Sequence, residues 1–253
     1  MTKTVVITQS NYLPWRGYFD LLRTADEVIL LDSVQYTRRD WRNRNRIKTA
    51  SGAIWLTVPV EVSGRYFQAI DETRVSDPGW ADNHRRTIDL AYRRAPHHAE
   101  VGGWLDALLA SVAKQELIST INEALLRAIC VRLGIHVPIR RCTDLLDREA
   151  MRDMDPTARL VNLAVAAGAD RYISGPAAKA YLDESAFTRR GVSVDWMSYA
   201  GYPEYPQLWG EFEPQVSIVD LLFNTGGSAP RFLRRSPPAF EHEGAPALTA
   251  QAS

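Results

Sequence analysis

The sequence predicts an α/β fold, with a Rossmann-like, mostly parallel sheet and a helical insertion at about 80–135. Short β-branched and apolar runs at 4–8 and 27–32 flank a helical pattern at 17–25, which is the strand–helix–strand order of a parallel unit. The same alternation returns in the last third of the chain, after a stretch in which apolar residues recur at helical spacing. We therefore expect one α/β domain over 1–235 with inserted helices.

Local patterns predict the elements in chain order. The run at 4–8 is typical of a central strand buried on both faces, and a polar turn at 9–16 leads into the first helix. A long functional loop is expected at 33–52. Further strands are predicted at 53–60, 137–141, 172–175 and 192–197, and further helices within 81–135 and at 156–167, 177–182 and 217–224. The Pro-, Ala-, Glu- and Gly-rich segment 236–253 is predicted to be disordered.

Composition excludes several classes of protein. The 30 basic and 30 acidic residues give a formal net charge of zero, which argues against binding of long nucleic acids, so an anion site must be local. Cys130 and Cys142 have no metal-ligand spacing and are predicted to be reduced thiols, and we expect no metal site. The start of the chain has no secretory pattern and no run approaches ~20 apolar residues, so we expect a cytoplasmic protein without a membrane partner. The oligomeric state stays open.

The turn after the first strand is predicted to face a ligand, because ligands of parallel α/β sheets bind beyond the carboxyl ends of the strands. Gly17 is expected at a helix start, where free backbone N–H groups favour an anion. Asn11 is expected to orient a reacting carbonyl. Alternatively, the aromatic residues of this turn only plug the end of the sheet. The predicted binding residues are Gln9, Tyr12, Trp15, Arg16, Gly17 and Tyr18.

A basic loop follows the second strand. Its eleven residues at 38–48 contain six cations and one acid, a local charge of +5 in a neutral chain. Arginine forks bind phosphate and carboxylate bidentately, and an extended backbone would place Arg42, Arg44 and Arg46 on one face. The alternatives are an edge strand protected by charge and a contact with single-stranded nucleic acid. The predicted binding residues of this region are Gln35, Arg39, Asp40, Arg42, Asn43, Arg44, Asn45, Arg46 and Lys48.

Two residues are candidates for proton transfer. His84 lies among cations on a helix, which would keep it neutral as a base, although helical histidines also serve in capping and packing. Asp32 ends a parallel strand, where a carboxylate can act as a base, meet ribose hydroxyls or cap the loop. Weaker predictions for binding, at the end of a later strand and in the loops beyond it, are Ser174, Gly175, Tyr181, Gln207 and Glu211.

Together with the turn, the stretch Asp32-Ser-Val-Gln-Tyr-Thr-Arg-Arg-Asp-Trp-Arg-Asn-Arg-Asn-Arg-Ile-Lys48 resembles the WbqC-like family. The resemblance extends through Trp55–Pro59, His84–Pro96, Tyr172–Pro176, Tyr205–Phe212 and Leu221–Asn224. It implies the tailoring of sugars or other small metabolites.

The opening segment is also similar to nucleotidyltransferases and pantothenate-synthetase-like ligases, which makes ATP or another nucleotide the candidate cofactor. Trp15 and Tyr18 replace the two histidines of that signature, which speaks against ordinary adenylyl transfer.

The leading hypothesis is transfer of an acyl or aminoacyl group to an amino sugar or similar phosphate-bearing metabolite. Arg42, Arg44 and Arg46 would clamp the phosphate of this anionic partner, and His84 or Asp32 would remove a proton. A glycosyltransferase using a nucleotide sugar is the alternative enzyme, although an Asp-x-Asp metal motif is missing. A noncatalytic protein that binds a sugar nucleotide or nucleic acid is the alternative from another class.

Overall fold

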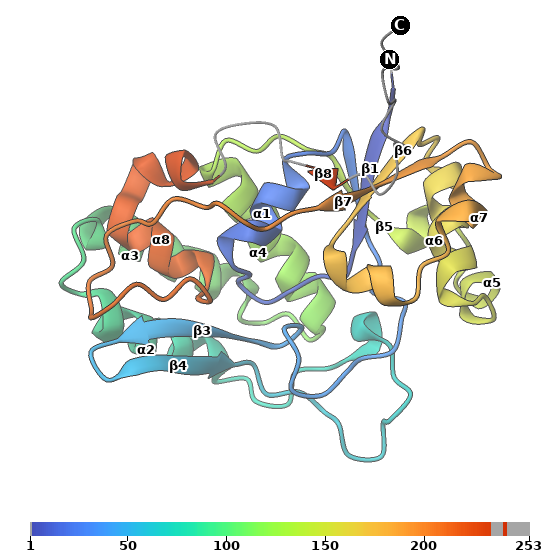
Figure 1. Cartoon of the computed structure of the whole chain (residues 1–253). Helices are drawn as coiled ribbons and strands as arrows, with labels where there is room; N and C mark the ends of the chain where they lie inside the picture. The colour runs from blue at the N-terminus through green and yellow to red at the C-terminus, as the bar shows by residue number, and fades with distance from the viewer. Residues whose placement is uncertain (1, 234–239, 242–253) are drawn as a thin grey trace, which may run out of the picture.

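The computed structural model describes residues 2–233 and 240–241 and contains a six-stranded sheet with helices on both faces (Figure 1). The strand order is β5-β2-β1-β6-β7-β8, and neighbours are parallel except for β8, which pairs antiparallel with β7. The predicted α/β class with a Rossmann-like, mostly parallel sheet is confirmed. The strands are β1 (Thr4–Thr8), β2 (Glu27–Leu30), β5 (Ile139–Arg141), β6 (Arg171–Ser174), β7 (Ser193–Met197) and β8 (Phe240–Glu241).

The central strand β1 separates two apolar clusters. Val5 and Ile7 belong to one cluster and Val6 to the other, because successive side chains of a strand point to opposite faces. The Val5 cluster includes side chains of α5 (Arg148–Arg152), α6 (Pro156–Ala166) and α7 (Glu184–Thr188). The Val6 cluster includes side chains of α1 (Arg16–Leu22), α2 (Trp80–Tyr92), α3 (His98–Val112), α4 (Ile118–Arg132) and α8 (Ile218–Thr225).

The predicted helical region at about 80–135 contains α2, α3 and α4. Their apolar side chains share one continuous cluster with Val6 of β1 and Val28 of β2. Short 3-10 helices lie elsewhere along the chain, at Ile70–Glu72, Cys142–Asp144, Pro176–Ala180 and Gly226–Phe232. The expected termination signals are also present, since Pro156 opens α6 and Gly168, with a φ of +68°, follows its end.

The long loop expected at 33–52 ends in a strand. β3 (Arg44–Thr49) and β4 (Gly52–Thr57) form an antiparallel hairpin that is a separate two-stranded sheet, and Gly52 turns the chain with a φ of +103°. The strand predicted at 53–60 is therefore β4, and it pairs with β3 and not with the parallel sheet. Figure 1 shows the hairpin below and to the left of the sheet, on the side of its lower end, toward which β1 runs.

Parts of three further predictions can be compared with the structure. Within the tail predicted to be disordered, Phe240–Glu241 form β8, and the other residues of 236–253 lie outside the described part of the chain. Both Cys130 and Cys142 are buried and free, as expected. None of the helices in the described ranges combines the length and apolar character required to span a bilayer.

Candidate functional site

The carboxyl ends of β1 and β6 mark the candidate site. The two strands are parallel neighbours with Val6 opposite Ile173, so the residues after Thr8 and after Ser174 leave the same edge of the sheet. β1 connects to β2 on one side, and β6 lies on its other side, so the strand order reverses between them. Ligands of open α/β sheets bind at such a reversal.

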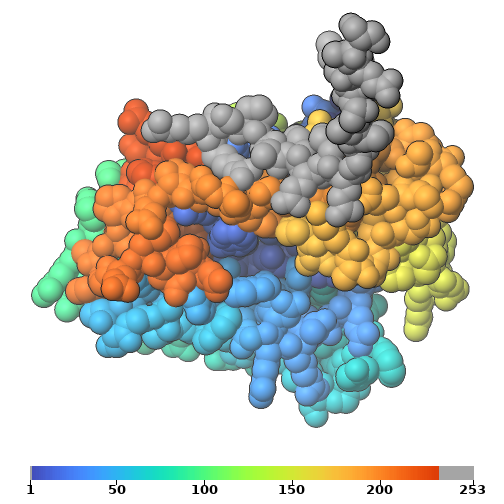
Figure 2. Space-filling view, in the orientation of Figure 1, coloured from blue at the N-terminus to red at the C-terminus, as the bar shows by residue number. Residues whose placement is uncertain are grey.

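A cavity of about 300 Å³ lies at this edge, between the turn after β1 and the hairpin. Figure 2 shows the N-terminal segment, in blue, recessed between the light-blue hairpin region below it and the orange segment above it. The cavity is lined by Asn11, Pro14, Trp15, Trp41, Asn45 and Gln215. We call this region, together with the exposed hairpin face beside it, the carboxyl-edge cleft.

Arg42 connects the basic loop to the turn. Its guanidinium donates to the side-chain oxygen of Asn11 and to the Ser10 carbonyl at 3.4 Å, and it lies 3.5 Å from Asp40 Oδ2. The Arg42 carbonyl in turn accepts a hydrogen bond of 2.8 Å from Asn122 on α4. Two residues predicted from separate segments, Asn11 and Arg42, are thus in direct contact.

The predicted alternation of the basic strand is confirmed. Asn43, Asn45 and Ile47 are buried, with 6%, 3% and 0% of their surface exposed, while the arginines between them remain partly exposed. The buried amides hold the hairpin in place: Asn45 Nδ2 donates to the Leu13 carbonyl at 2.9 Å and Asn43 Nδ2 to the Val58 carbonyl at 2.8 Å. The amide face therefore serves mainly the fold, although Asn45 also lines the cavity.

Two tryptophans lie on the exposed face of the hairpin region. The Arg44 guanidinium is 4.1 Å from the centre of the Trp55 ring, and that ring is 5.5 Å from Trp41. Trp41 and Trp55 are 42% and 45% exposed. Arg44 also donates to the Arg39 carbonyl. An exposed aromatic and cationic surface thus adjoins the cavity at Trp41.

The other end of this hairpin face is covered. Arg46 forms an ion pair of 3.1 Å with Glu213. Lys48 is buried and donates to Gln207 Oε1 at 2.7 Å and to the Glu211 carbonyl. Gln207 also donates to Asp220 of α8 at 2.8 Å. Lys48, Gln207 and Glu211 therefore come together, but away from the residues that line the cavity.

Asp220 completes this covered network. Its carboxylate accepts hydrogen bonds from Tyr92 at 2.9 Å and from Tyr205 at 2.8 Å, and burial raises its pKa above the ordinary range. The side chain joins α2, α8 and the segment around Tyr205. These contacts order the segment around Tyr205 against α2 and α8.

Arg16 and Gly17 do not face the cavity. The Arg16 guanidinium lies 4.9 Å from the centre of the Tyr202 ring and donates to the Pro203 carbonyl at 2.6 Å. The Trp15 indole covers Gly17, since a Cβ added there would lie 2.3 Å from the ring. Helix α1 has seven residues, all buried. The anion site expected at this helix start is thus occupied by the protein's own side chains.

His84 is a buried link between three segments. Its Nε2 lies 3.1 Å from the Thr57 carbonyl, and its Nδ1 lies 2.7 Å from the Tyr12 hydroxyl. Because a carbonyl can only accept, Nε2 carries the proton and Nδ1 accepts from Tyr12. Burial lowers the pKa of His84 to about 4, so it is neutral as expected, but through desolvation and not through neighbouring cations. Both ring nitrogens are engaged, and the residue is 5% exposed.

Asp32 lies at the end of β2, on the other side of the turn. Ser10 donates its backbone N–H to Asp32 Oδ1 at 2.8 Å, and the carboxyl lines a smaller cavity of about 130 Å³. Burial raises the pKa of Asp32 to about 6. The group is therefore ionised at neutral pH but close to its titration range.

The remaining predicted residues contribute in other ways. Ser174 is buried and accepts a hydrogen bond of 3.1 Å from Tyr172, and Gly175 leaves room for the Tyr199 hydroxyl. Tyr181 is 58% exposed. Three further residues contact main-chain groups: Gln35 donates to the Tyr66 carbonyl at 2.9 Å, Tyr18 donates to the Gln9 carbonyl at 2.8 Å, and Asp40 accepts from Trp41 N at 2.7 Å.

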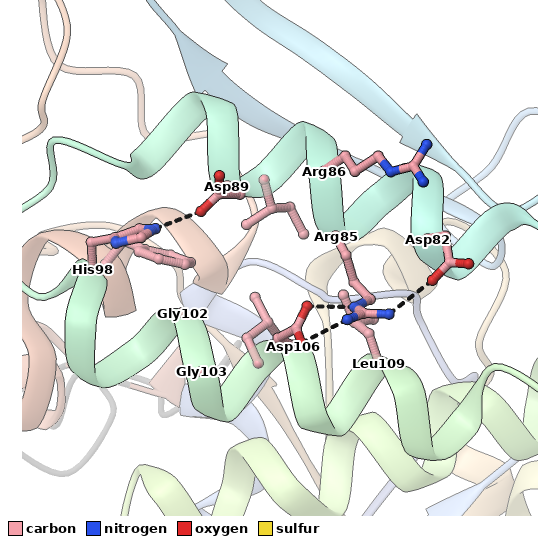
Figure 3. A pocket seen from close by; sticks show the side chains of 12 residues that line it. Asp82, Arg85, Arg86, Asp89, His98, Gly102, Gly103, Asp106 and Leu109 are labelled. Carbon is pink, nitrogen blue, oxygen red and sulfur yellow. Dashed lines mark hydrogen bonds and ion pairs between the residues drawn. The ribbon is translucent and has the colours of Figure 1, made fainter.

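Another cavity, of about 500 Å³, is a groove between α2 and α3 (Figure 3). Most of the charged side chains there pair with each other. Arg85 contacts Asp106 and Asp82, the latter at 2.8 Å, and His98 Nε2 lies 2.7 Å from Asp89. The groove is lined by helical residues and none from the carboxyl edge of the sheet. We call it the α2–α3 groove.

Comparison with known proteins identifies the family of this chain. The model of the WbqC-like protein family matches residues 9–232. The chain belongs to the WbqC-like family. It is 48% identical to an uncharacterized protein, Rv1507c, of Mycobacterium tuberculosis, over 234 residues that make up 92% of this chain and 98% of that protein. No solved structure matches.

Several residues of the WbqC-like cleft were not among the predicted binding residues. Trp41 stands inside the basic loop, so its position beside Arg42 was a usable signal. Pro14 lies in the predicted turn. Gln215 and Trp55 reach the cleft through pairing with distant segments: Gln215 O accepts from Arg46 at 3.2 Å, and Trp55 lies opposite Arg46 in the hairpin. No local pattern in the sequence indicates those two contacts.

Proposed function

We propose that this WbqC-like chain is a transferase that attaches an acyl or aminoacyl group to an amino sugar or similar phosphate-bearing metabolite bound in the carboxyl-edge cleft. The observation that carries the proposal is the cavity at the reversal of strand order, where Asn11, Trp41 and the guanidinium of Arg42 meet. A concave site with apolar walls and a few oriented polar groups is typical of small-molecule binding.

The charge of the cleft favours an anionic substrate. Arg42 donates to Asn11 of the cavity and lies 3.5 Å from Asp40, and Arg44 lies over the exposed Trp55. Arg46 is paired more closely, at 3.1 Å from Glu213, and Lys48 is enclosed. Of the three arginines expected to bind phosphate, we therefore keep Arg42 and Arg44 and leave out Arg46. Because the chain as a whole has zero net charge, attraction of an anion depends on this local group.

Ring-shaped substrates suit the aromatic part of the cleft. Trp15 and Trp41 line the cavity, and Trp41 continues into the exposed Trp55. Aromatic faces pack against apolar faces of sugars and against bases. A phosphate held by Arg42 with its attached ring against Trp41 would place the amino group of the substrate near Asn11.

The two predicted proton acceptors, His84 and Asp32, differ in whether a ligand can reach them. His84 is enclosed, with both nitrogens engaged by the protein. Asp32 lines a cavity and is ionised at neutral pH because its pKa is about 6. Of the two, Asp32 is therefore the group that a ligand can reach, and it does so in the smaller cavity beside the cleft.

Turnover with defined substrates tests the proposal. Nucleotide-linked amino sugars are incubated with ATP and a panel of carboxylic and amino acids, and products are identified by mass spectrometry. The proposal expects an amide product heavier than the amino sugar by the mass of the acid minus one water, and its loss in Arg42→Ala but not in Arg85→Ala. Transfer of the sugar itself, with release of nucleotide, would instead identify a glycosyltransferase, and saturable binding without product would identify a binding protein.

A further inference from the structure

The smaller cavity at the carboxyl ends of β2 and β5 has features that the cleft around Trp41 lacks. Its volume of about 130 Å³ equals that of about four water molecules, which is also the size of a small α-amino acid. Its walls come from the strand ends, the loop around Asp71 and the start of α4. The lining residues that matter are Asp32, Asp71, Ser119, Thr120, Arg141 and Arg148.

One side of the cavity carries a carboxylate that has no cation within ion-pair distance among the described residues. Asp32 is 6% exposed and accepts hydrogen bonds from Ser10, from its backbone N–H at 2.8 Å and from its side chain, and the charges of Arg42 and Arg141 act on it from a greater distance. Within residues 2–233 and 240–241 no lysine, arginine or histidine forms an ion pair with it. Burial of a carboxylate without an ion pair costs free energy, so Asp32 favours a cationic donor from outside the chain.

The two arginines of the cavity are already neutralised. Arg148 forms a bidentate pair with Asp71, with 3.0 Å between Nη1 and Oδ1, and Arg141 Nε lies 2.7 Å from Glu123 Oε2. The lining charges therefore sum to −1, and the excess is that of Asp32. This balance disfavours a phosphate, which would carry further negative charge into the cavity.

The opposite side of the cavity is the start of α4, a helix of fifteen residues that lacks both a side-chain N-cap and an acidic residue in its first turn. Ile118 N donates to the Thr73 carbonyl at 3.0 Å, and Ile121 N makes the first intrahelical bond, to the Leu117 carbonyl at 3.2 Å. The N–H groups of Ser119 and Thr120 find no acceptor among the described residues. A helix start of this kind favours a carboxylate.

We propose that this cavity binds a small α-amino acid, with its ammonium group on Asp32 and its carboxylate on the free N–H groups at the start of α4. The inference rests on the proposed function, in which the amino acid is the donor of an aminoacyl group. An amine alone would leave the helix start unsatisfied, and a carboxylate alone would leave Asp32 unpaired. Only a zwitterion matches both sides of a cavity of this size.

A matched series of ligands tests the inference on the wild-type chain without sugar or nucleotide. Glycine and L-alanine are compared with propionate, which lacks the ammonium group, and with ethylamine, which lacks the carboxylate, by isothermal titration calorimetry. We expect glycine or alanine to bind at least tenfold more tightly than either analogue. Failure of both amino acids to bind, or equal binding of an analogue, overturns the inference and leaves the proposal for the carboxyl-edge cleft standing.

Asp32→Asn tests the ammonium site directly. Asparagine keeps an acceptor for Ser10 N–H and removes the charge, so alanine should bind at least tenfold more weakly while propionate binds no worse. Asp106→Asn, in the α2–α3 groove, is the matched control and should bind alanine as the wild type does. Unchanged alanine affinity in Asp32→Asn, in a variant whose thermal unfolding shows a folded protein, overturns the inference.

Discussion

The α2–α3 groove and the carboxyl edge of the sheet differ in how their charged side chains are satisfied. In the groove, Arg85 forms an ion pair with Asp106 and His98 lies against Asp89, so most of the charged side chains have a partner within the protein. At the carboxyl edge, Asp32 lines a cavity and has no ion pair in the described part of the chain. Arg44 lies over the exposed Trp55, and Arg42 donates to the cavity residue Asn11 and lies 3.5 Å from Asp40. The groove is larger, about 500 Å³ against about 300 Å³. Whether the charged side chains are paired within the protein therefore distinguishes the binding site from the groove better than cavity volume does.

The largest expected difference between the two regions is in how their carboxylates affect the free energy of unfolding at different pH values. The pKa of Asp32 is raised from 3.8 to about 6, so between these values the native state binds more protons than the unfolded state. The free energy of unfolding then falls as pH rises through this window. Asp32→Asn removes the effect and should stabilise the protein at pH 7 by up to about 3 kcal/mol, whereas Asp106→Asn, whose carboxyl has a lowered pKa beside Arg85, should not. Urea unfolding at pH 7 measures the difference, and a destabilised Asp32→Asn would break the comparison.

His84 should produce the opposite slope. Its pKa is lowered from 6.5 to about 4, so the unfolded state binds more protons in this range and the free energy of unfolding rises with pH. In the wild type the two slopes oppose each other between about pH 4 and 6. We expect Asp32→Asn to show a steeper rise of stability over this range, worth up to about 3 kcal/mol from His84. Unfolding curves at pH 4.5, 5.5 and 6.5 test this, and an unchanged pH profile in Asp32→Asn would contradict it.

Ligand affinity should distinguish the arginines of the two regions. Arg42→Ala should weaken binding of a nucleotide-linked amino sugar by about thirtyfold, because a hydrogen bond to a charged group contributes about 2 kcal/mol. Arg85→Ala should change it less than twofold. Calorimetric titration measures both, and Arg42→Lys, which keeps the charge but loses the fork, should fall between them. Equal losses in the two alanine variants would remove the distinction between cleft and groove.

Trp41 should contribute less to ligand affinity than Arg42. Trp41→Ala should weaken binding of the same ligand by about fivefold, since an aromatic contact contributes about 1 kcal/mol, and Trp41→Phe should recover most of it. Leu90→Ala is a control on α2, where Leu90 is 64% exposed. An affinity that is insensitive to Trp41→Ala would place the substrate ring elsewhere.

The fold class and the position of the cleft could be predicted because they depend on short-range patterns. The β-branched run of β1 indicated a strand buried on both faces, and from that the carboxyl edge followed. The two-residue period of the basic segment correctly separated its arginines from Asn43, Asn45 and Ile47. Patterns of this kind are local, so they can be recognised in the sequence without knowledge of the tertiary structure.

Other contacts depend on residues far apart in the sequence. Arg16 was expected to bind an anion, yet it packs against Tyr202 and Tyr205, and Lys48 is enclosed by Gln207. The unpaired charge of Asp32 and the uncapped start of α4 also become meaningful only when they face one cavity. A cation in the sequence does not reveal whether the protein or a ligand will neutralise it.

A crystal structure of the chain with a bound nucleotide-linked amino sugar tests the central claim most directly. The account predicts density for the ligand in the cavity lined by Asn11 and Trp41, with its phosphate on Arg42. Density in the α2–α3 groove, with the carboxyl-edge cleft empty, would contradict it.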